Sequence, residues 1–241
     1  MKWGDVRKEF EVRFEGSLRG SPVDVWEAIT ERTAGWLWPM EYEHRLGGAV
    51  TGLSEAGGTV TAWEPPRHLA VHSENAEGWV NDLDYVVEAW GRGTFLRYTH
   101  TGVFDAADWD NEYEACRQHT EFYFHTLGEY LAHFKGRPAT YLTADAEGRF
   151  ARVRAAIGLP DRASVGNRAR FEVPALDPVD AVVDFATANF VGLRTREGLL
   201  RFYGRDAFGW PVGLAHHLFE GGIDRDKTQR AWAAWLEGLY R

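Results

Sequence analysis

The chain of 241 residues carries a formal net charge of −9, is 44% hydrophobic and contains 11 tryptophans. This length allows one large domain or two small ones. The acidic balance and the lack of a basic stripe argue against a nucleic acid as partner. A single cysteine excludes an internal disulfide bond and fits a reducing compartment. Because no apolar run of about 18 residues and no signal peptide are found, we expect a cytoplasmic protein that does not span or bind a membrane.

The first elements follow from alternation and from helix-start signals. Residues 8–15 alternate apolar and charged side chains, which predicts a strand with one solvated face. Ser21 as N-cap, Pro22 at the first helical position and Asp24 closing a capping box predict a short helix. A second short helical stretch is expected near 31–38. Strands are then expected near 43–52, 58–64 and 67–73.

A hairpin over residues 79–103 is the most informative feature of the sequence. Its two strands flank the turn at Gly91, and a loop at 91–92 pairs Tyr85 with Tyr98, whereas a loop at 92–93 slips the pairing by two. Either register puts polar groups on the face that should be buried, and buried polar groups need partners. A cavity that holds water or a ligand would supply them. The polar residues on this face are Asn81, Tyr85, Tyr98 and His100.

A long helix is predicted from a cap at Asp108 or Asp110 to about Phe134. Its apolar residues recur every three or four positions, which gives a continuous stripe on one face. Thr120 is the clearly polar member of that stripe. The stripe consists of Tyr113, Cys116, Thr120, Tyr123, Leu127, Tyr130 and Phe134.

The second half of the chain repeats the ending of the first, with strands followed by a capped helix. Residues 144–157 are a candidate helix, closed by Gly158 and Pro160. The final helix is expected to start at Asp224 and to carry Trp232 and Trp235 on one side. Strand-like runs lie between these helices, at 168–173, 181–186, 190–194, 198–203 and 212–219.

Five sequence pieces occur in an order that resembles the START-like helix-grip (SRPBCC) superfamily. They are SPVDVWEAIT, the stretch ending GWLWP, GGTVTAWEPPRHLAV, GTFLRYTHTGV, and a tryptophan before a long helix that ends LGEYL. Within the superfamily the chain looks most like bacterial homologues of the activator of the heat-shock-protein-90 ATPase. The resemblance covers residues 8–134 and implies an α+β fold, in which a curved antiparallel sheet grips a long C-terminal helix around a cavity.

The expected domains are a helix-grip domain over 1–138 and a reduced second lobe of similar design over 139–241. The connection near 136–143 is short and rich in apolar residues, so we expect the second lobe to pack on the first. The resemblance implies an apolar ligand, and some superfamily members are cyclases or hydrolases. The candidate ligand-binding residues are Trp36, Trp38, Trp63, Trp79, Asn81, Tyr85, Tyr98, His100, Thr120 and Phe124.

Each candidate also has a purely structural interpretation. The tryptophans and the two tyrosines can be core residues, and His100 is either a satisfied structural histidine or a general base. Thr120 can hydrogen-bond to its own helix instead of facing the cavity. Cys116 lies among apolar neighbours inside a helix, which favours an unreactive thiol. The carboxylates of Asp82, Asp84 and Glu88 belong to the solvated face of the hairpin.

The histidines show no zinc spacing, since His216 and His217 are adjacent in a strand and point to opposite faces. Nucleotide-binding and serine-hydrolase motifs are absent from the sequence, so no metal and no cofactor are expected. The leading hypothesis is a binding protein for a small apolar or aromatic molecule. An enzyme of the cyclase, aromatase or hydrolase kind with His100 as acid or base is one alternative. The other is a co-chaperone-like module that docks a protein partner through the second lobe.

Overall fold

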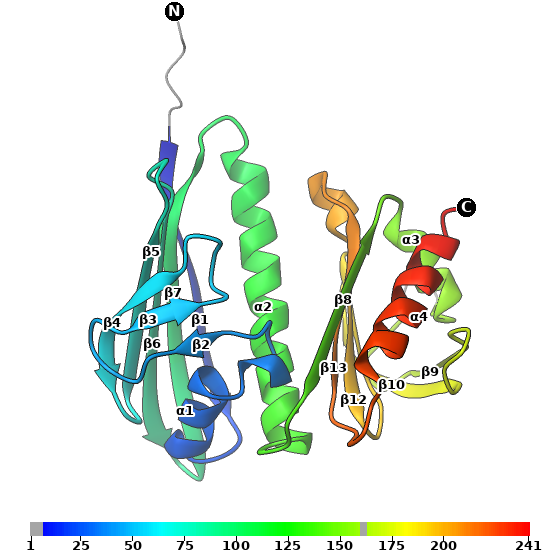
Figure 1. Cartoon of the computed structure of the whole chain (residues 1–241), viewed down its shortest axis with the longest axis horizontal. Helices are drawn as coiled ribbons and strands as arrows, with labels where there is room; N and C mark the ends of the chain where they lie inside the picture. Colours follow the sequence, from blue (N-terminus) through cyan, green and yellow to red (C-terminus); the bar gives the residue numbers. More distant parts are fainter. Residues whose placement is uncertain (1–6, 160–162) are drawn as a thin grey trace, which may run out of the picture. The chain divides into compact units, whose positions relative to one another are not determined.

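The computed structural model describes residues 7–159 and 163–241 (Figure 1). Contacts between Cα atoms divide the chain into two compact units. The first holds the described residues up to Thr33 and Leu37–Gly136, and the second holds Ala34–Trp36 and the described residues from Arg137 onward. Thus the chain enters the second unit for three residues before it completes the first.

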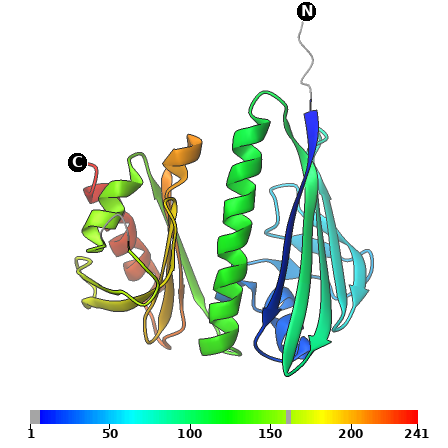
Figure 2. The ribbon, with the colours of Figure 1, turned by 180° about the vertical axis from the view of Figure 1, so that it is seen from behind.

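Within the described residues, the first unit contains one antiparallel sheet and two α-helices (Figures 1 and 2). The strand order is β1-β7-β6-β5-β4-β3-β2, so β1 is an edge strand. The helix α2 packs along β1 and β7, and α1 packs against β6, β7 and α2. The elements are β1 (Arg7–Leu18), α1 (Pro22–Thr30), a 3₁₀ turn (Thr33–Gly35), β2 (Glu41–Tyr42), β3 (Ala49–Thr51), β4 (Gly58–Glu64), β5 (His68–Glu74), β6 (Val80–Trp90), β7 (Gly93–Asp105) and α2 (Trp109–His133).

Helix α1 starts at the predicted capping box. The Ser21 hydroxyl accepts a hydrogen bond from the Asp24 amide, and the Asp24 carboxylate accepts one from the Ser21 amide. These bonds satisfy amides that the first turn of a helix leaves without partners. The helical stretch expected near 31–38 is wrong in extent, because only the 3₁₀ turn Thr33–Gly35 forms there. Of the strand expected at 43–52 only β3 (Ala49–Thr51) forms, while β2 (Glu41–Tyr42) lies before that range.

The hairpin β6–β7 takes the first of the two registers that the sequence allowed. Tyr85 pairs with Tyr98 and Leu83 with His100, and the turn closes between Trp90 and Gly93. Gly91 adopts a φ of 60° there, a left-handed conformation that costs glycine little. This register fixes which side chains of β6 and β7 lie opposite one another.

Helix α2 is buried over more of its circumference than a single stripe. Thr120, Leu127 and Tyr130 of the predicted stripe are buried, but so are Phe122 and Thr126. The sequence pattern therefore identified the helix and one of its buried sides. Asp108 occupies the N-cap position, although its side chain makes no capping bond.

The second unit is also a sheet with a helix on it. Over the described residues its strand order is β8-β13-β12-β11-β10-β9, all antiparallel. Its elements are β8 (Thr140–Ala146), α3 (Phe150–Ala156), β9 (Arg168–Phe171), β10 (Val179–Ala186), β11 (Phe190–Arg194), β12 (Gly198–Tyr203), a 3₁₀ turn (Arg205–Phe208), β13 (Val212–Leu218) and α4 (Arg225–Gly238).

The helix expected over 144–157 is wrong in its first part. Residues 144–146 belong to β8, where they pair with β13, and the helix begins only at Phe150. Pro160 lies outside the described residues. The final helix is confirmed, since the Asp224 carboxylate accepts from the Lys227 amide and caps α4. Trp232, Trp235 and Leu236 of α4 belong to the apolar core of this unit.

The fold is therefore of the α+β class, with two antiparallel sheets that each carry a helix. The first unit has the helix-grip arrangement, in which the long helix α2 follows the last strand and lies on the sheet. The second unit repeats this plan with one strand fewer and a shorter final helix, and α3 follows its first strand β8 as α1 follows β1. Among the helices of the described ranges, none is long and apolar enough to cross a membrane.

Candidate functional site

The inner face of the first unit is an aromatic cluster. Phe124 of α2 stacks on Phe14 of β1 with ring centroids 4.3 Å apart, and its ring lies 4.7 Å from that of Tyr98. Tyr85 and Tyr98 are neighbours at 4.7 Å, and their hydroxyls hydrogen-bond to each other. Burial raises the pKa of both phenols well above the usual value. At neutral pH both phenols are therefore uncharged, and they are hydrogen-bond partners of each other.

A chain of polar side chains continues from this cluster toward the start of α2. Asn81 Oδ1 lies 3.0 Å from His100 Nε2, and His100 Nδ1 lies 3.4 Å from Cys116 Sγ. Thr120, one turn further along α2, hydrogen-bonds to the Cys116 sulfur. Asn81, His100 and Thr120 are three of the ten predicted ligand-binding residues, and their role as ligand contacts stays a prediction. Cys116 links them.

The tautomer of His100 follows from its partners. The amide oxygen of Asn81 can only accept, so Nε2 carries the proton and Nδ1 has a free lone pair. The Cys116 thiol therefore donates to Nδ1. Burial lowers the pKa of His100 to about 4 against a smaller opposing effect of Asp82, and burial raises the pKa of Cys116 to about 11. The resting pair is neutral, with a thiol that points at a basic nitrogen.

An open groove of about 650 Å³ lies at the same end of the sheet. Its apolar wall consists of Phe10 of β1 and of Trp109 and Tyr113, which stack in parallel in the first turns of α2 with centroids 4.8 Å apart. Its rim is acidic. The residues that line it are Glu9, Phe10, Glu11, Val80, Asp82, Thr101, Gly102, Val103, Trp109 and Tyr113.

Three residues of the groove are neighbours of the polar side chains Asn81, His100 and Cys116. Phe10 packs edge-on against the His100 ring at 4.9 Å. Gly102 is the Cα partner of Asn81 in the β6–β7 ladder. Tyr113 lies one helical turn before Cys116 on α2. Residues that line the groove are thus direct neighbours of Asn81, His100 and Cys116, and the Cys116 and His100 side chains are only partly buried.

None of the ten predicted ligand-binding residues is among those that line this groove. The four tryptophans of that set are dispersed over the chain. Trp36 is buried and belongs to the second unit, and Trp38 donates to the Gly52 carbonyl. Trp63 packs against Trp26 and His44, and Trp79 lies under the Arg7 guanidinium. Their role as ligand contacts stays a prediction.

The carboxylates of the hairpin lie on the outer face, as expected, and are more organised than a solvated surface requires. Asp84 contacts His68 at 2.8 Å and Asp82 contacts His72 at 2.6 Å. Glu88 forms an ion pair with Arg97 across the hairpin. Each negative charge thus has a partner on a neighbouring strand, which stabilises the pairing of β5, β6 and β7.

In the second unit the adjacent histidines point to opposite faces, as the strand pattern requires. His216 lies edge-on against Trp232 at 4.2 Å, while His217 Nδ1 donates to the Ala34 carbonyl at 2.8 Å. Burial lowers the pKa of each to about 3. Within residues 7–159 and 163–241, no group of three or more His, Cys, Asp or Glu side chains could hold a metal ion.

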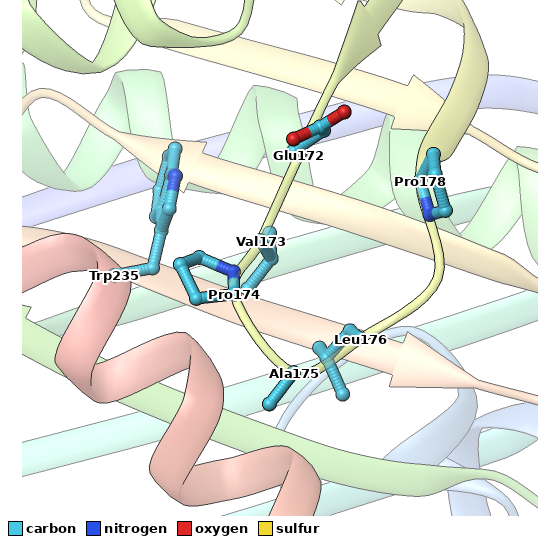
Figure 3. Close-up of a pocket in the computed structure, with 7 residues that line it drawn as sticks. All are labelled: Glu172, Val173, Pro174, Ala175, Leu176, Pro178 and Trp235. Carbon is cyan, nitrogen blue, oxygen red and sulfur yellow. The ribbon is translucent and has the colours of Figure 1, made fainter.

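A second open groove, of about 650 Å³, lies in the second unit between the β9–β10 loop and α4 (Figure 3). Figure 3 shows the Pro174 ring turned toward Trp235 and the Glu172 carboxylate above them. Ala175 in this loop has a φ of 68°, which is unusual for a residue with a side chain. Apart from Glu172 the groove offers no charged side chain to a ligand.

Sequence analysis missed Cys116, Trp109 and Tyr113 as site residues. The spacing could have revealed them, because Trp109, Tyr113, Cys116 and Thr120 follow one another at three or four residues and so share one side of α2. Cys116 is only partly buried, whereas a buried thiol was expected. Its contact with His100 of β7 depends on how α2 packs on the sheet, which the sequence pattern does not specify.

No protein-family model matches this sequence, and no curated protein matches it. Several solved structures are similar. DynU16 of the dynemicin biosynthetic locus is 15% identical over 95% of this chain and 97% of its own, with a TM-score of 0.43. CalU16 from Micromonospora echinospora is 18% identical over 53% of this chain and 87% of its own, with a TM-score of 0.42. The Aha1 dimer from Colwellia psychrerythraea is 16% identical over 51% of this chain and 96% of its own, with a TM-score of 0.41. At such identities and scores no residue role follows from these proteins.

Proposed function

We propose that the first unit binds a small aromatic or apolar molecule in the groove at the start of α2. The observation that carries this proposal is the stacked pair Trp109 and Tyr113, which lines an open groove of about 650 Å³ together with Phe10. Ligand sites in proteins have volumes of roughly 300–1,000 Å³ and aromatic walls. Tyr113 and Lys8 cover the faces of the Trp109 ring, so an aromatic ligand would contact the edge of the stacked pair, and such an edge-to-face contact adds about 0.5–1.5 kcal/mol to the burial of apolar area.

The charge of the rim narrows the class of ligand. Glu9, Glu11 and Asp82 line the groove, while Glu11 is paired with Arg13 and Asp82 with His72. Lys8 sits over the other side of Trp109, with its ammonium 3.6 Å from the ring centroid. The net effect is a negative rim, which favours a neutral or cationic ligand over an anionic one.

Dye binding to the whole chain tests this proposal. We expect the neutral dye Nile red to bind with increased fluorescence, and an anionic naphthalene sulfonate dye to bind more weakly. Trp109→Ala should weaken Nile red binding about tenfold, since the stacked wall is lost. The matched control is Trp90→Ala, because Trp90 is exposed at the far end of β6, roughly 33 Å from Val80.

Equal binding by wild type and Trp109→Ala would contradict the proposal, and so would a loss confined to Trp90→Ala. Native mass spectrometry of freshly purified protein complements the dye assay. A retained small molecule, released from wild type and absent from Trp109→Ala, would give the mass of the natural ligand.

A further inference from the structure

The inner face of the first unit holds the parts of a nucleophilic site. A nucleophile within reach of a base, and a third group that orients that base, are the geometric signature of covalent catalysis. Cys116 is the nucleophile, His100 the base at 3.4 Å, and Asn81 the orienting group at 3.0 Å from the other ring nitrogen. These three come from α2, β7 and β6 and meet only in the folded chain.

We propose that Cys116, His100 and Asn81 form an acyl-transfer site, at which the Cys116 thiol accepts the acyl group of an ester or thioester. Cys116 Sγ attacks the carbonyl carbon, and a new S–C bond forms as the C–O or C–S bond to the leaving group breaks. The thiol proton passes to His100 Nδ1 and from there to the leaving alcohol or thiol. The product is a thioester on Cys116, and no oxidant or cofactor takes part.

Each neighbour has a defined part in this reaction. Asn81 holds the Nε2–H tautomer and so keeps the Nδ1 lone pair aimed at the sulfur. Thr120 donates a hydrogen bond to the sulfur, which stabilises negative charge as the proton leaves. Cys116 and His100 are only partly buried, and Phe10, which packs against the His100 ring, and Gly102, which pairs with Asn81, line the neighbouring groove.

The resting protonation states decide the type of mechanism. The groups that act on the pair are Asp82 from β6, Tyr98 from β7 and Thr120 from α2. With the thiol pKa raised to about 11 and the imidazole pKa lowered to about 4, no thiolate–imidazolium pair exists before substrate binds. Proton transfer then accompanies attack, as with a hydroxyl nucleophile and a general base.

The chain has one cysteine, so every thioester maps to Cys116. The test is to incubate the full chain with p-nitrophenyl acetate, follow release of p-nitrophenol, and locate the acetyl group by mass spectrometry of peptides. We expect one acetyl group on Cys116 and none at this position in Cys116→Ala, which has no nucleophilic atom. His100→Gln should slow acetylation by about 100-fold or more, which is the usual contribution of general-base catalysis. The matched control is His68→Gln, because His68 pairs with Asp84 on the outer face and should leave the rate unchanged.

The pH profile of the wild-type chain tests the role of His100 without any variant. General-base catalysis by a neutral imidazole gives a nearly constant rate from about pH 6 to about pH 8. An unassisted thiol would instead react about tenfold faster per pH unit, in proportion to its thiolate fraction. Asn81→Ala and Thr120→Val should each lower the rate while the profile stays flat.

Acetylation confined to lysine, an unchanged rate in His100→Gln, or a tenfold rise per pH unit would overturn this proposal. The proposal is independent of the ligand-binding function. A small ester that reaches the thiol can acylate it even if Nile red does not bind, and dye binding can succeed while Cys116 stays unmodified.

Discussion

In the second unit, Arg201 of β12 and Asp184 of β10 form a buried ion pair. Both carboxylate oxygens lie 2.9 Å from Arg201 Nη1, and the two side chains are 0% and 3% exposed. Gly192 on the neighbouring strand leaves the space for them, since a Cβ there would collide with both partners. Removing one partner of such a pair leaves a buried charge without compensation, which is strongly destabilising.

We therefore expect Asp184→Ala to lower the free energy of unfolding by about 3–5 kcal/mol. Chemical denaturation with urea measures this value. The control is Asp180→Ala, which removes a fully exposed carboxylate paired with Arg168 and Arg170 on the adjacent strand and should change stability little. Equal midpoints for the two variants would mean that the buried pair contributes no more than the exposed one.

His216 and His217 make the stability of the second unit depend on pH. Burial lowers the pKa of both to about 3, whereas in an unfolded chain it is about 6.5. Between these values the unfolded chain binds protons that the folded chain does not. Stability is therefore constant above about pH 6.5 and falls as the pH falls toward 3, by up to about 1.4 kcal/mol per pH unit for each histidine.

His217→Gln should reduce this acid dependence, because glutamine can still donate to the Ala34 carbonyl but does not titrate. Melting temperatures at about pH 7 and about pH 5 give the difference for each variant. His133→Gln, at an exposed histidine, serves as the control. An identical fall in wild type and His217→Gln would show that His217 does not contribute to the loss of stability in acid.

At the scale of single residues, part of the candidate site could be predicted from the sequence. The alternation of β6 and β7 was enough to put Asn81, Tyr85, Tyr98 and His100 on the inner face, because parity alone decides it. Which of these groups touch one another depends on the distance between sheet and helix. The Cys116–His100 contact and the aromatic groove at Trp109 follow from that distance, which no residue pattern specifies.

Helix α1 depends on its capping box at the scale of an element. Ser21 and Asp24 exchange hydrogen bonds, and Asp24 also contacts Lys135 at 3.0 Å beyond the end of α2. The bond from the Ser21 amide, together with Lys135, holds the pKa of Asp24 below its usual value. The cap therefore fixes the start of α1 and, through Asp24, attaches it to the end of α2.

Ser21→Ala should lower the free energy of unfolding by about 1 kcal/mol, the usual cost of losing an N-cap side chain. Ser17→Ala is a matched control, because Ser17 is exposed in β1. Denaturation curves of the two variants provide the comparison. A difference below the error of the measurement would mean that water replaces the cap at no cost.

Helices with a long periodic pattern or a side-chain cap were predictable, as α2 was from its periodicity, whereas a short helix without a cap was not. Helices α1 and α4 begin where Ser21 and Asp224 predict them, and each of these side chains accepts a backbone hydrogen bond. Helix α3 has no side-chain cap, and the residues before it pair with β13 in preference to extending the helix. Strand β8 pairs with β13, some 70 residues away along the chain. A local sequence pattern carries no information on such a distant partner.

At the scale of the whole molecule, the chain does not complete one unit before it starts the other. Ala34–Trp36 belong to the second unit although they follow α1 of the first. Trp36 is only 2% exposed, and the Ala34 carbonyl accepts a hydrogen bond from His217 of β13. The sequence places Trp36 in the first domain because the resemblance covers residues 8–134. No local pattern indicates that the neighbouring Ala34 contacts a residue 183 positions away.

A fragment of residues 1–138 should therefore be less stable than the whole chain. It keeps Ala34–Trp36 but lacks β13 and the rest of the second unit, so a large apolar side chain and a carbonyl lose their partners. Exposing a buried tryptophan costs about 25 cal/mol for each Å² of apolar surface and promotes association. We expect the fragment to aggregate or to melt well below the full chain in light scattering and calorimetry.

Trp36→Gln in the fragment should restore solubility, whereas Trp90→Gln, at a tryptophan already exposed, should not restore it. A soluble, monomeric fragment as heat-stable as the full chain would show instead that the first unit folds independently and that Trp36 needs no partner from the second.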